Sequence, residues 1–305
     1  MPDVGGPSTE RSNYTFAANS LRASFFSHCA NPRCSTGWMQ MWRNRRAPAF
    51  EGRWACSAGC MEEIVRLAVH RETGGPSHPY AHRLPLGLTL IEQGRITQED
   101  LRHAIVARDI AAQEGRGATP LGAWLVESGI LNETMLTRAL SAQWSCPVFS
   151  MESEYCPAEV ATALPRLLAE AFGAVPLRAA GGNLLYVAFA NRIDRSLAYA
   201  MERMLGVRLT SGVLRDSEYL RARGEFLEEA GPATKFLEAA TVAALARLLT
   251  RCIEQEKPAE ARLVGVHEYC WLRMWKQAPR GEGLPKTGDV EDIVCTVGQK
   301  FGDIP

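Results

Sequence analysis

The stretch PLGAWLVESGILNETMLTRALSAQ, residues 120–143, repeats the pattern of PLGLTLIEQGRITQEDLRHAIVAR, residues 85–108. In both stretches, apolar residues three and four positions apart indicate a short helix followed by a second helix. Pro85 and Pro120 suit a first helical turn, because the N–H that proline lacks has no partner there in any case. The sequence therefore predicts two copies of one helical hairpin.

Each copy also contains residues that end its first helix and begin its second. Gly94 and Gly129 follow the first helix, where glycine adopts the left-handed conformation at little cost. Thr97 and Asp100 form a capping-box pattern in the first copy, and Asn132 is the cap in the second. These packing and capping signals explain the repeat without any ligand.

The rest of the chain divides at segments rich in glycine, proline and polar residues. Helical and strand patterns alternate after the second hairpin, with Gly181 and Gly182 at an expected β-turn, and the strongest helical pattern covers 234–256. The predicted fold class is α+β, with a small zinc finger, the two-hairpin helical repeat, a small α/β sandwich and a C-terminal α+β module. The predicted segments are disorder at 1–20, a finger at 21–72, a linker at 73–82, a domain at 83–223 (hairpins at 85–108 and 120–143, α/β part at 144–223), a linker at 224–233, a helix plus hairpin at 234–276 and a tail at 277–305.

Bulk composition fits an ordinary globular protein of two or three domains. Hydrophobic residues make up 46% of the 305, and the 34 basic and 34 acidic residues give a net charge of +0. This balance weighs against a protein that binds nucleic acid over its whole surface, because such binding needs an excess of basic residues to neutralise the phosphates. The N-terminus lacks a secretory pattern, and no stretch approaches the roughly 18 apolar residues of a membrane span. We therefore expect a cytoplasmic protein without a membrane span.

Four of the nine cysteines form two closely spaced pairs near the N-terminus: Cys29 with Cys34, and Cys56 with Cys60. In a reducing compartment, such a group indicates metal binding rather than disulfides. The second pair precedes the helical pattern MEEIVRLAVHRE, as in a treble-clef zinc finger, so we predict a structural zinc site with four thiolate ligands. Free or disulfide-bonded cysteines are the alternative.

The predicted finger is also basic and aromatic. Residues 21–72 contain eight arginines and four glutamates, with Trp38, Trp42 and Trp54 between them. Such a surface can stack bases and bind phosphates. The alternative, which we favour, is that the tryptophans form the small core of the finger.

At the residues of the repeat, the chain resembles the N-terminal domain of type II secretion and type IV pilus assembly ATPases. The family pattern is approximately R-L-G-x-x-L-L-x-x-G-x-I-x-x-x-x-L-x-x-A-L-x-x-Q, and the resemblance covers 83–223 well and 234–276 loosely. It implies docking to secretion or pilus machinery and, in some members, binding of cyclic di-GMP by both copies. The ligand residues it implies here are Leu86, Gly87, Leu90, Gly94, Arg108, Leu121, Gly122, Leu125, Gly129 and Gln143.

The chain departs from this pattern at its polar positions. Pro85 and Pro120 replace the leading arginine of the family, and Arg108 replaces the closing glutamine that the second copy keeps as Gln143. Arginine offers several donors to a phosphate or guanine, whereas proline offers none. A cyclic di-GMP site and hairpins retained only for packing and docking both stay open.

The sequence shows no motor motif. The one lysine followed by serine or threonine, Lys286, has Arg280 and Pro285 where a P-loop needs glycines. We therefore expect no motor domain within the 305 residues that end at Pro305. We find no nucleophile elbow and no zinc-protease motif. We therefore expect a non-catalytic adaptor or regulator that acts by docking, with a cyclic di-GMP receptor and a nucleic-acid-binding finger as alternatives.

Overall fold

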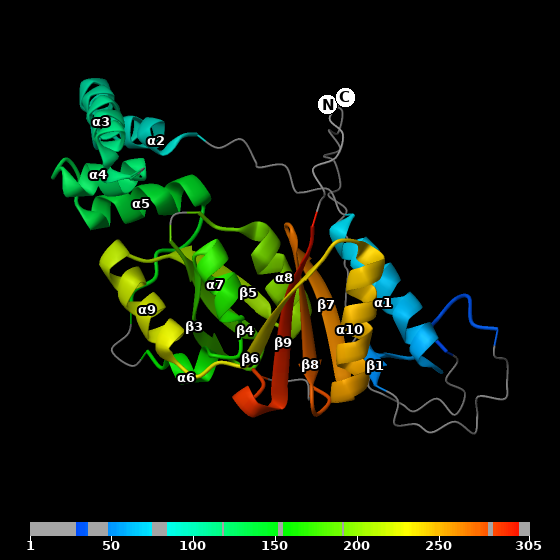
Figure 1. Ribbon diagram of the computed structural model, residues 1–305. Coiled ribbons are helices and arrows are strands. Elements are labelled where there is room, and N and C mark those ends of the chain that lie inside the picture. The colour runs from blue at the N-terminus through cyan, green and yellow to red at the C-terminus, as the bar shows by residue number, and fades with distance from the viewer. Residues whose placement is uncertain are drawn as a thin grey trace, which may run out of the picture.

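The computed structural model describes residues 29–35, 48–74, 84–117, 119–151, 155–190, 192–279 and 283–298. Figure 1 shows the helical repeat at one end of the molecule, next to an α/β layer that lies beside a larger sheet. The predicted disorder at 1–20, the side chains of Trp38 and Trp42, and most of the linker at 73–82 fall outside the described residues.

The predicted helical hairpins are present, and they interlock. The Thr97 hydroxyl accepts a hydrogen bond from Asp100 N while the Asp100 carboxylate accepts one from Thr97 N, and Asn132 caps its helix through Met135 N. The first helix of each copy packs on the second helix of the other copy, around a shared apolar core, so the repeat is one unit. Its helices are α2 (Leu86–Glu92), α3 (Gln98–Ala111), α4 (Leu121–Glu127) and α5 (Glu133–Trp144).

A three-stranded layer follows the repeat. Its strands lie in the order β3-β4-β5, with β3 and β4 antiparallel through the predicted turn at Gly181 and Gly182, and β4 and β5 parallel. The parallel pair requires a crossover, which α8 provides. The elements are α6 (Pro157–Val160), α7 (Arg166–Phe172), β3 (Ala174–Ala180), β4 (Leu184–Phe189), α8 (Arg195–Leu205), β5 (Arg208–Val213) and α9 (Asp216–Glu228).

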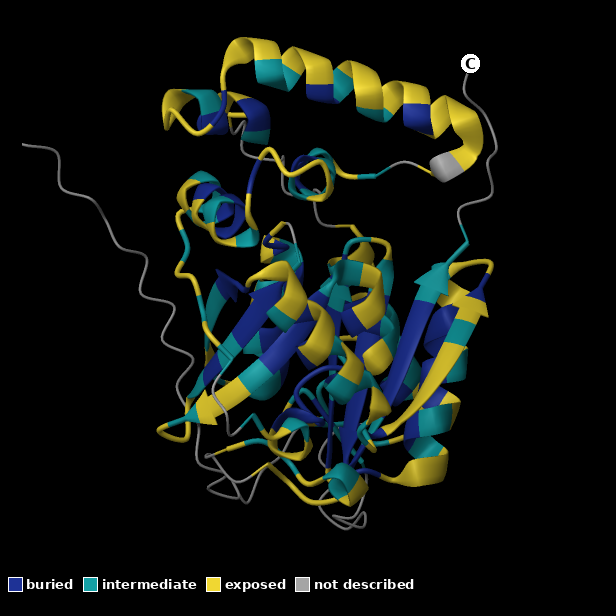
Figure 2. Cartoon of the chain, turned by 90° about the vertical axis from the view of Figure 1, so that its left-hand side faces the viewer, coloured by how far each residue is buried: buried dark blue, intermediate teal, exposed yellow. Residues whose placement is uncertain are grey.

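Four C-terminal strands and a hairpin from the N-terminal part of the chain form a six-stranded sheet in the order β2-β1-β7-β8-β9-β6. Along β8, Trp271 and Trp275 face the α/β layer while Leu272 and Met274 face helices α1 and α10 on the opposite side, so the sheet has two cores. The inner strands β7, β8 and β9 are largely buried, whereas the edge strand β6 is mostly exposed. Figure 2 shows this contrast, and it also shows the exposed outer surface of the repeat. The elements are β1 (Ala49–Phe50), β2 (Arg53–Trp54), α1 (Ala58–Thr73), β6 (Ala233–Ala239), α10 (Val242–Glu256), β7 (Glu260–Val266), β8 (Tyr269–Trp275) and β9 (Val290–Val297).

Three predictions about the C-terminal half are wrong in detail. Residues 224–228 are the end of helix α9 rather than linker, and 234–239 form strand β6 rather than the start of a helix. The predicted tail at 277–305 contains β9, which lies between β8 and β6. Strand β6 pairs with β9 along its whole length, and a local pattern does not reveal a partner so far along the chain.

The predicted finger is also less separate than its sequence indicates. Its hairpin β1–β2 extends the C-terminal sheet through parallel pairing of Phe50 with Ala261, and α1 packs on α10. The cysteine segment and the C-terminal module therefore share one apolar core.

Candidate metal centre and helical repeat

The structure brings the four predicted metal ligands together. The sulfur atoms of Cys29, Cys34, Cys56 and Cys60 all lie within 4.8 Å of one another. Cys34 Sγ lies 3.6 Å from Cys56 Sγ, and Cys56 Sγ lies 3.6 Å from Cys60 Sγ. Each sulfur is partly buried, at the meeting point of a turn, the β1–β2 hairpin and the first turn of α1.

Local backbone geometry explains how each pair is presented. Asn31 forms an Asx turn by accepting a hydrogen bond from Arg33 N at 2.8 Å, which turns the chain back between Cys29 and Cys34. Ser57 caps α1 by accepting a hydrogen bond from Cys60 N at 3.2 Å, so Cys60 lies in the first helical turn.

Two hydrogen bonds reach the sulfurs themselves. Asn31 Nδ2 donates to Cys60 Sγ at 3.3 Å, and the backbone N–H of Cys56 donates to Cys29 Sγ at 3.4 Å. Donors aimed at sulfur stabilise a thiolate, the form that binds metal. Asn31 is not among the predicted site residues, although an asparagine between two closely spaced cysteines is a recognisable turn signal.

The sulfur spacing fits a tetrahedral thiolate site. A zinc ion about 2.3 Å from four sulfurs at tetrahedral corners separates the sulfurs by about 3.8 Å, close to the observed pairs. Without a cation, burial and the neighbouring thiols raise the pKa of Cys29 to about 12, despite hydrogen bonds from the backbone. The cluster is therefore suited to hold a cation that stabilises four thiolates together.

The glycines of the repeat are explained by helix contact. A Cβ built at Gly87 would lie 2.8 Å from the end of the Leu101 side chain, and one built at Gly122 would lie 2.9 Å from that of Leu136. Gly94 and Gly129 both have positive φ values, 63° and 74°, as predicted for helix exits. Among the predicted ligand residues, Leu90 and Leu125 are fully buried in the core of the repeat, and Leu86 and Leu121 pack against it.

The two polar residues predicted for a ligand make contacts within the chain. Gln143 Nε2 donates to the backbone oxygen of Leu84 at 2.7 Å, which joins the end of the second hairpin to the start of the first. Arg108 forms an ion pair with Asp109 at 2.8 Å on the exposed side of α3. Pro85 and Pro120 stand at the N-caps of α2 and α4 with no side-chain hydrogen bond.

Comparison with known proteins gives matches among solved structures. No protein-family model matches the chain, and no curated protein matches it. Part of the chain is similar in structure to MshE and to the N-terminal domain of XpsE.

The similarity covers somewhat less than half of the chain. A structure of MshE with cdg has 23% identity and a TM-score of 0.36, and the match covers 47% of this chain and 99% of that one. Two structures of the XpsE N-terminal domain have 19% and 22% identity and TM-scores of 0.32 and 0.26, with 46% and 45% of this chain covered and 92% and 90% of theirs. All three structures share less than 25% identity with this chain, so the likeness assigns it neither a ligand nor a partner. Among the described residues, no helix has the length and apolarity to cross a bilayer.

Proposed function

We propose that the chain is a non-catalytic adaptor that docks to a protein of the secretion or pilus machinery through its first helical hairpin. The supporting observation is a difference between the two copies of the repeat. Four large apolar residues of the first copy are about half exposed, at 49–56%: Leu84, Leu88, Val106 and Ile110. The equivalent positions of the second copy carry small or polar residues: Thr119, Ala123, Ser141 and Ser145.

This difference fits an interface better than a packing requirement. The second copy already contacts the α/β layer, where Glu133 accepts a hydrogen bond from Ser217 and α5 packs on β5. The first copy extends away from that layer (Figure 1) and presents its apolar residues outward. Val106 and Ile110 lie four residues apart on α3, so their exposed side chains share one face of that helix. An exposed apolar face commonly marks a protein interface.

Binding to the purified cytoplasmic domain of a secretion or pilus platform protein tests this proposal. Val106→Glu combined with Ile110→Glu should weaken binding at least about ten-fold, because a central apolar anchor contributes about 1–2 kcal/mol. Ala142→Glu, at an exposed position of α5, is the matched control and should bind like the wild type. Failure of the wild type to bind platform components, or full binding by the double variant, refutes the proposal.

For the cysteine cluster we propose a structural zinc ion. Thiolates select soft or borderline metals, and four protein ligands leave no open position for a reacting water. Metal analysis of the reduced, purified protein should give about one zinc per chain, and Cys56→Ser should lower that ratio. Cys156→Ser, at an exposed position outside the cluster, is the control. A ratio near zero in the wild type refutes the assignment.

A second candidate function is cyclic di-GMP binding by the two hairpins. The observation in its favour is that Gln143, the residue that matches the family pattern, lies where the two hairpins meet. Calorimetry with cyclic di-GMP decides between receptor and scaffold. Heat of binding that is lost in Gln143→Ala supports a receptor, and no heat at concentrations well above micromolar excludes it.

A further inference from the structure

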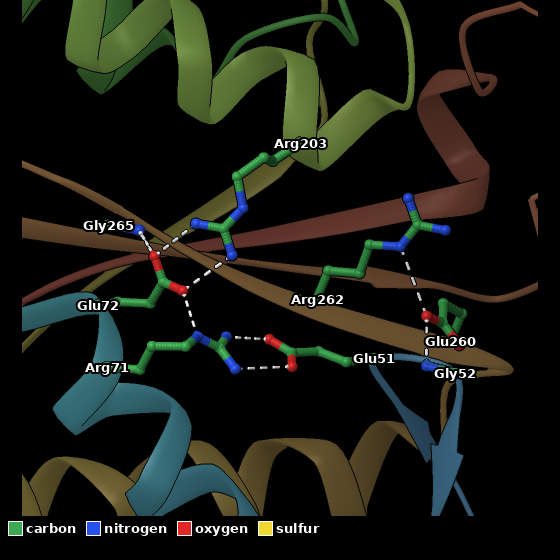
Figure 3. A network of polar contacts seen from close by, with 8 residues as sticks. All are labelled: Glu51, Gly52, Arg71, Glu72, Arg203, Glu260, Arg262 and Gly265. Atoms are coloured by element: carbon green, nitrogen blue, oxygen red, sulfur yellow. Dashed lines mark hydrogen bonds and ion pairs between the residues drawn. The ribbon is translucent and has the colours of Figure 1, made fainter. Parts of the chain in front are cut away.

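The end of helix α1 makes contacts that the cysteine cluster does not explain. Glu72, the penultimate residue of this helix, has a side chain only 6% exposed. Its carboxylate accepts hydrogen bonds from both terminal nitrogens of Arg203 on α8, each at 2.9 Å, from Arg71 Nε at 2.7 Å and from Gly265 N on β7 at 2.8 Å. Figure 3 shows these contacts converging on one carboxylate.

The contact therefore ties together three parts of the fold. Helix α1 belongs to the cysteine segment, α8 to the α/β layer and β7 to the C-terminal sheet. Although burial alone would raise it, the hydrogen bonds from Arg203, Arg71 and Gly265 hold the pKa of Glu72 below its ordinary value. The carboxylate is thus ionised and paired where the three parts meet.

Gly265 allows this close approach. A Cβ built at Gly265 would lie 2.6 Å from the backbone oxygen of Glu72, a contact with backbone that no side-chain rotation relieves. A glycine at this point of β7 therefore fits the docked end of α1.

The turn between β1 and β2 is attached to the same strand. Glu51 N donates to Ala261 O at 2.7 Å, and Gly52 N donates to the buried Glu260 carboxylate at 2.9 Å. Arg71 links the two contact sites on β7, because its guanidinium donates to Glu72 and also pairs with Glu51 at 3.1 Å. Figure 3 shows both attachments beside each other.

Both attachments lie near the C-terminal end of α1, a continuous 16-residue helix that begins at the cysteine cluster. Cys60 lies in its first turn and Glu72 lies roughly 18 Å further along its axis. Met61, Val65 and Val69 fix the helix to the core that it shares with α10 and the sheet. Because the helix is continuous, it provides a direct path by which a displacement at one end can reach the other.

We propose that metal binding at the four cysteines is coupled through α1 to the joint formed by Glu72, Arg203 and Gly265. The proposal rests on the metal site proposed above. With the metal bound, the first turn of α1 and the β1–β2 hairpin are fixed on β7, and Glu72 is held in its pocket of donors. Without it, the cysteine segment separates from β7, and the joint between the sheet and α8 loosens. Through this coupling, the contact between the C-terminal sheet and the α/β layer depends on whether metal is bound.

Coupling between sites is reciprocal, which gives a sharp test at residues far from the sulfurs. Zinc affinity is measured for the full chain by competition with a chromophoric chelator. Glu72→Gln and Gly265→Ala should each weaken zinc binding within the range of about 5- to 150-fold that is typical of coupled sites. Glu170→Gln, on the exposed side of α7, and Gly224→Ala, in α9 with open space around it, are matched controls that should bind zinc like the wild type.

Hydrogen exchange of the wild-type protein provides a second test of the coupling, and this test needs no variant. Removal of zinc by a chelator should increase deuterium uptake in β7 and α8 and leave the helices of the repeat unchanged. Unchanged zinc affinity in both variants, or unchanged uptake in β7 and α8, refutes the coupling. If the wild type holds no zinc, the metal assignment itself fails, and this result is distinct from a zinc site that is present but uncoupled.

Discussion

The backbone of Gly122 lies against the side chain of Leu136, and a Cβ built at this glycine would come within 2.9 Å of Leu136 Cδ1. The same relation joins Gly87 to Leu101 in the other copy, at 2.8 Å. The repeated LG of the sequence is therefore a helix-packing signature. In each hairpin it lets the first helix approach the second more closely than any larger residue permits.

Gly122→Ala should leave the protein at least about 1 kcal/mol less stable than Gly224→Ala does, because both substitutions gain helix propensity but only the one at Gly122 meets the end of a leucine side chain. Urea denaturation followed by circular dichroism measures the change. Gly224→Ala is the control: it lies within helix α9 with nothing near its Cβ, and should stabilise by about 0.5–1 kcal/mol. A gain for Gly122→Ala as large as that of the control would contradict the packing explanation.

The ion pair between Arg273 and Asp292 is fully buried between the sheet and the α/β layer. Two hydrogen bonds of 2.7 Å join the side chains, and Trp271 Nε1 donates to the same carboxylate at 2.8 Å. Asp292→Ala should cost about 3–5 kcal/mol, because it leaves a buried guanidinium without a counter-charge. Thermal and urea denaturation check this.

The control for this pair is Glu291→Gln. Glu291 pairs with the half-exposed Lys235 at 3.8 Å, so its loss should cost no more than about 1 kcal/mol. The double variant Arg273→Met with Asp292→Leu should recover most of the stability lost in Asp292→Ala, because it removes both charges. A double variant as unstable as the single one would show that the cost arises from packing.

Stability should depend on pH through Glu72. The folded-state pKa of this carboxyl lies below its ordinary value of 4.5, so its contribution is complete above pH 4.5 and is lost as the pH falls through the folded-state pKa. The difference in unfolding free energy between the wild type and Glu72→Gln should therefore be constant from pH 7 to about 5 and shrink below that. A difference that grows on acidification would contradict the ion-pair explanation.

Glu260 should affect the pH dependence of stability in the opposite direction to Glu72. Burial raises its pKa, even though Arg262 and Gly52 N favour the charged form, so the folded protein binds this proton more readily than the unfolded chain. The stability of Glu260→Gln relative to the wild type should be higher at pH 7 than at pH 4, because the ionised wild-type carboxylate carries the burial cost only at the higher pH. Parallel pH titrations of the two variants separate these effects from general acid denaturation.

Thiol labelling provides a prediction for the cysteine cluster. In the zinc-loaded protein, Cys29, Cys34, Cys56 and Cys60 should resist alkylation, while the exposed Cys156 reacts at once. Addition of a strong chelator should make the four react, as followed by mass spectrometry. Rapid labelling of all four before the chelator is added would contradict metal ligation.

The sequence by itself determined the features that rest on local chemistry. Thr97 and Asn132 cap their helices because a cap needs only a side-chain oxygen next to free backbone N–H groups. The strand turn at Gly181 and Gly182 and the cysteine pairs are likewise short-range patterns. Apolar periodicity located both hairpins of the repeat, because it depends on neighbours within one or two turns.

Only the tertiary structure decided how distant segments join. Strand β6 has a sequence that reads as the start of a helix, yet it pairs with β9, and β1 pairs with β7 about two hundred positions away. The carboxylate of Glu72 meets Arg203 and Gly265 for the same reason. Parallel pairing and buried ion pairs are contacts between residues far apart in the chain, and their stability comes from burial and complementary charge that no local pattern contains.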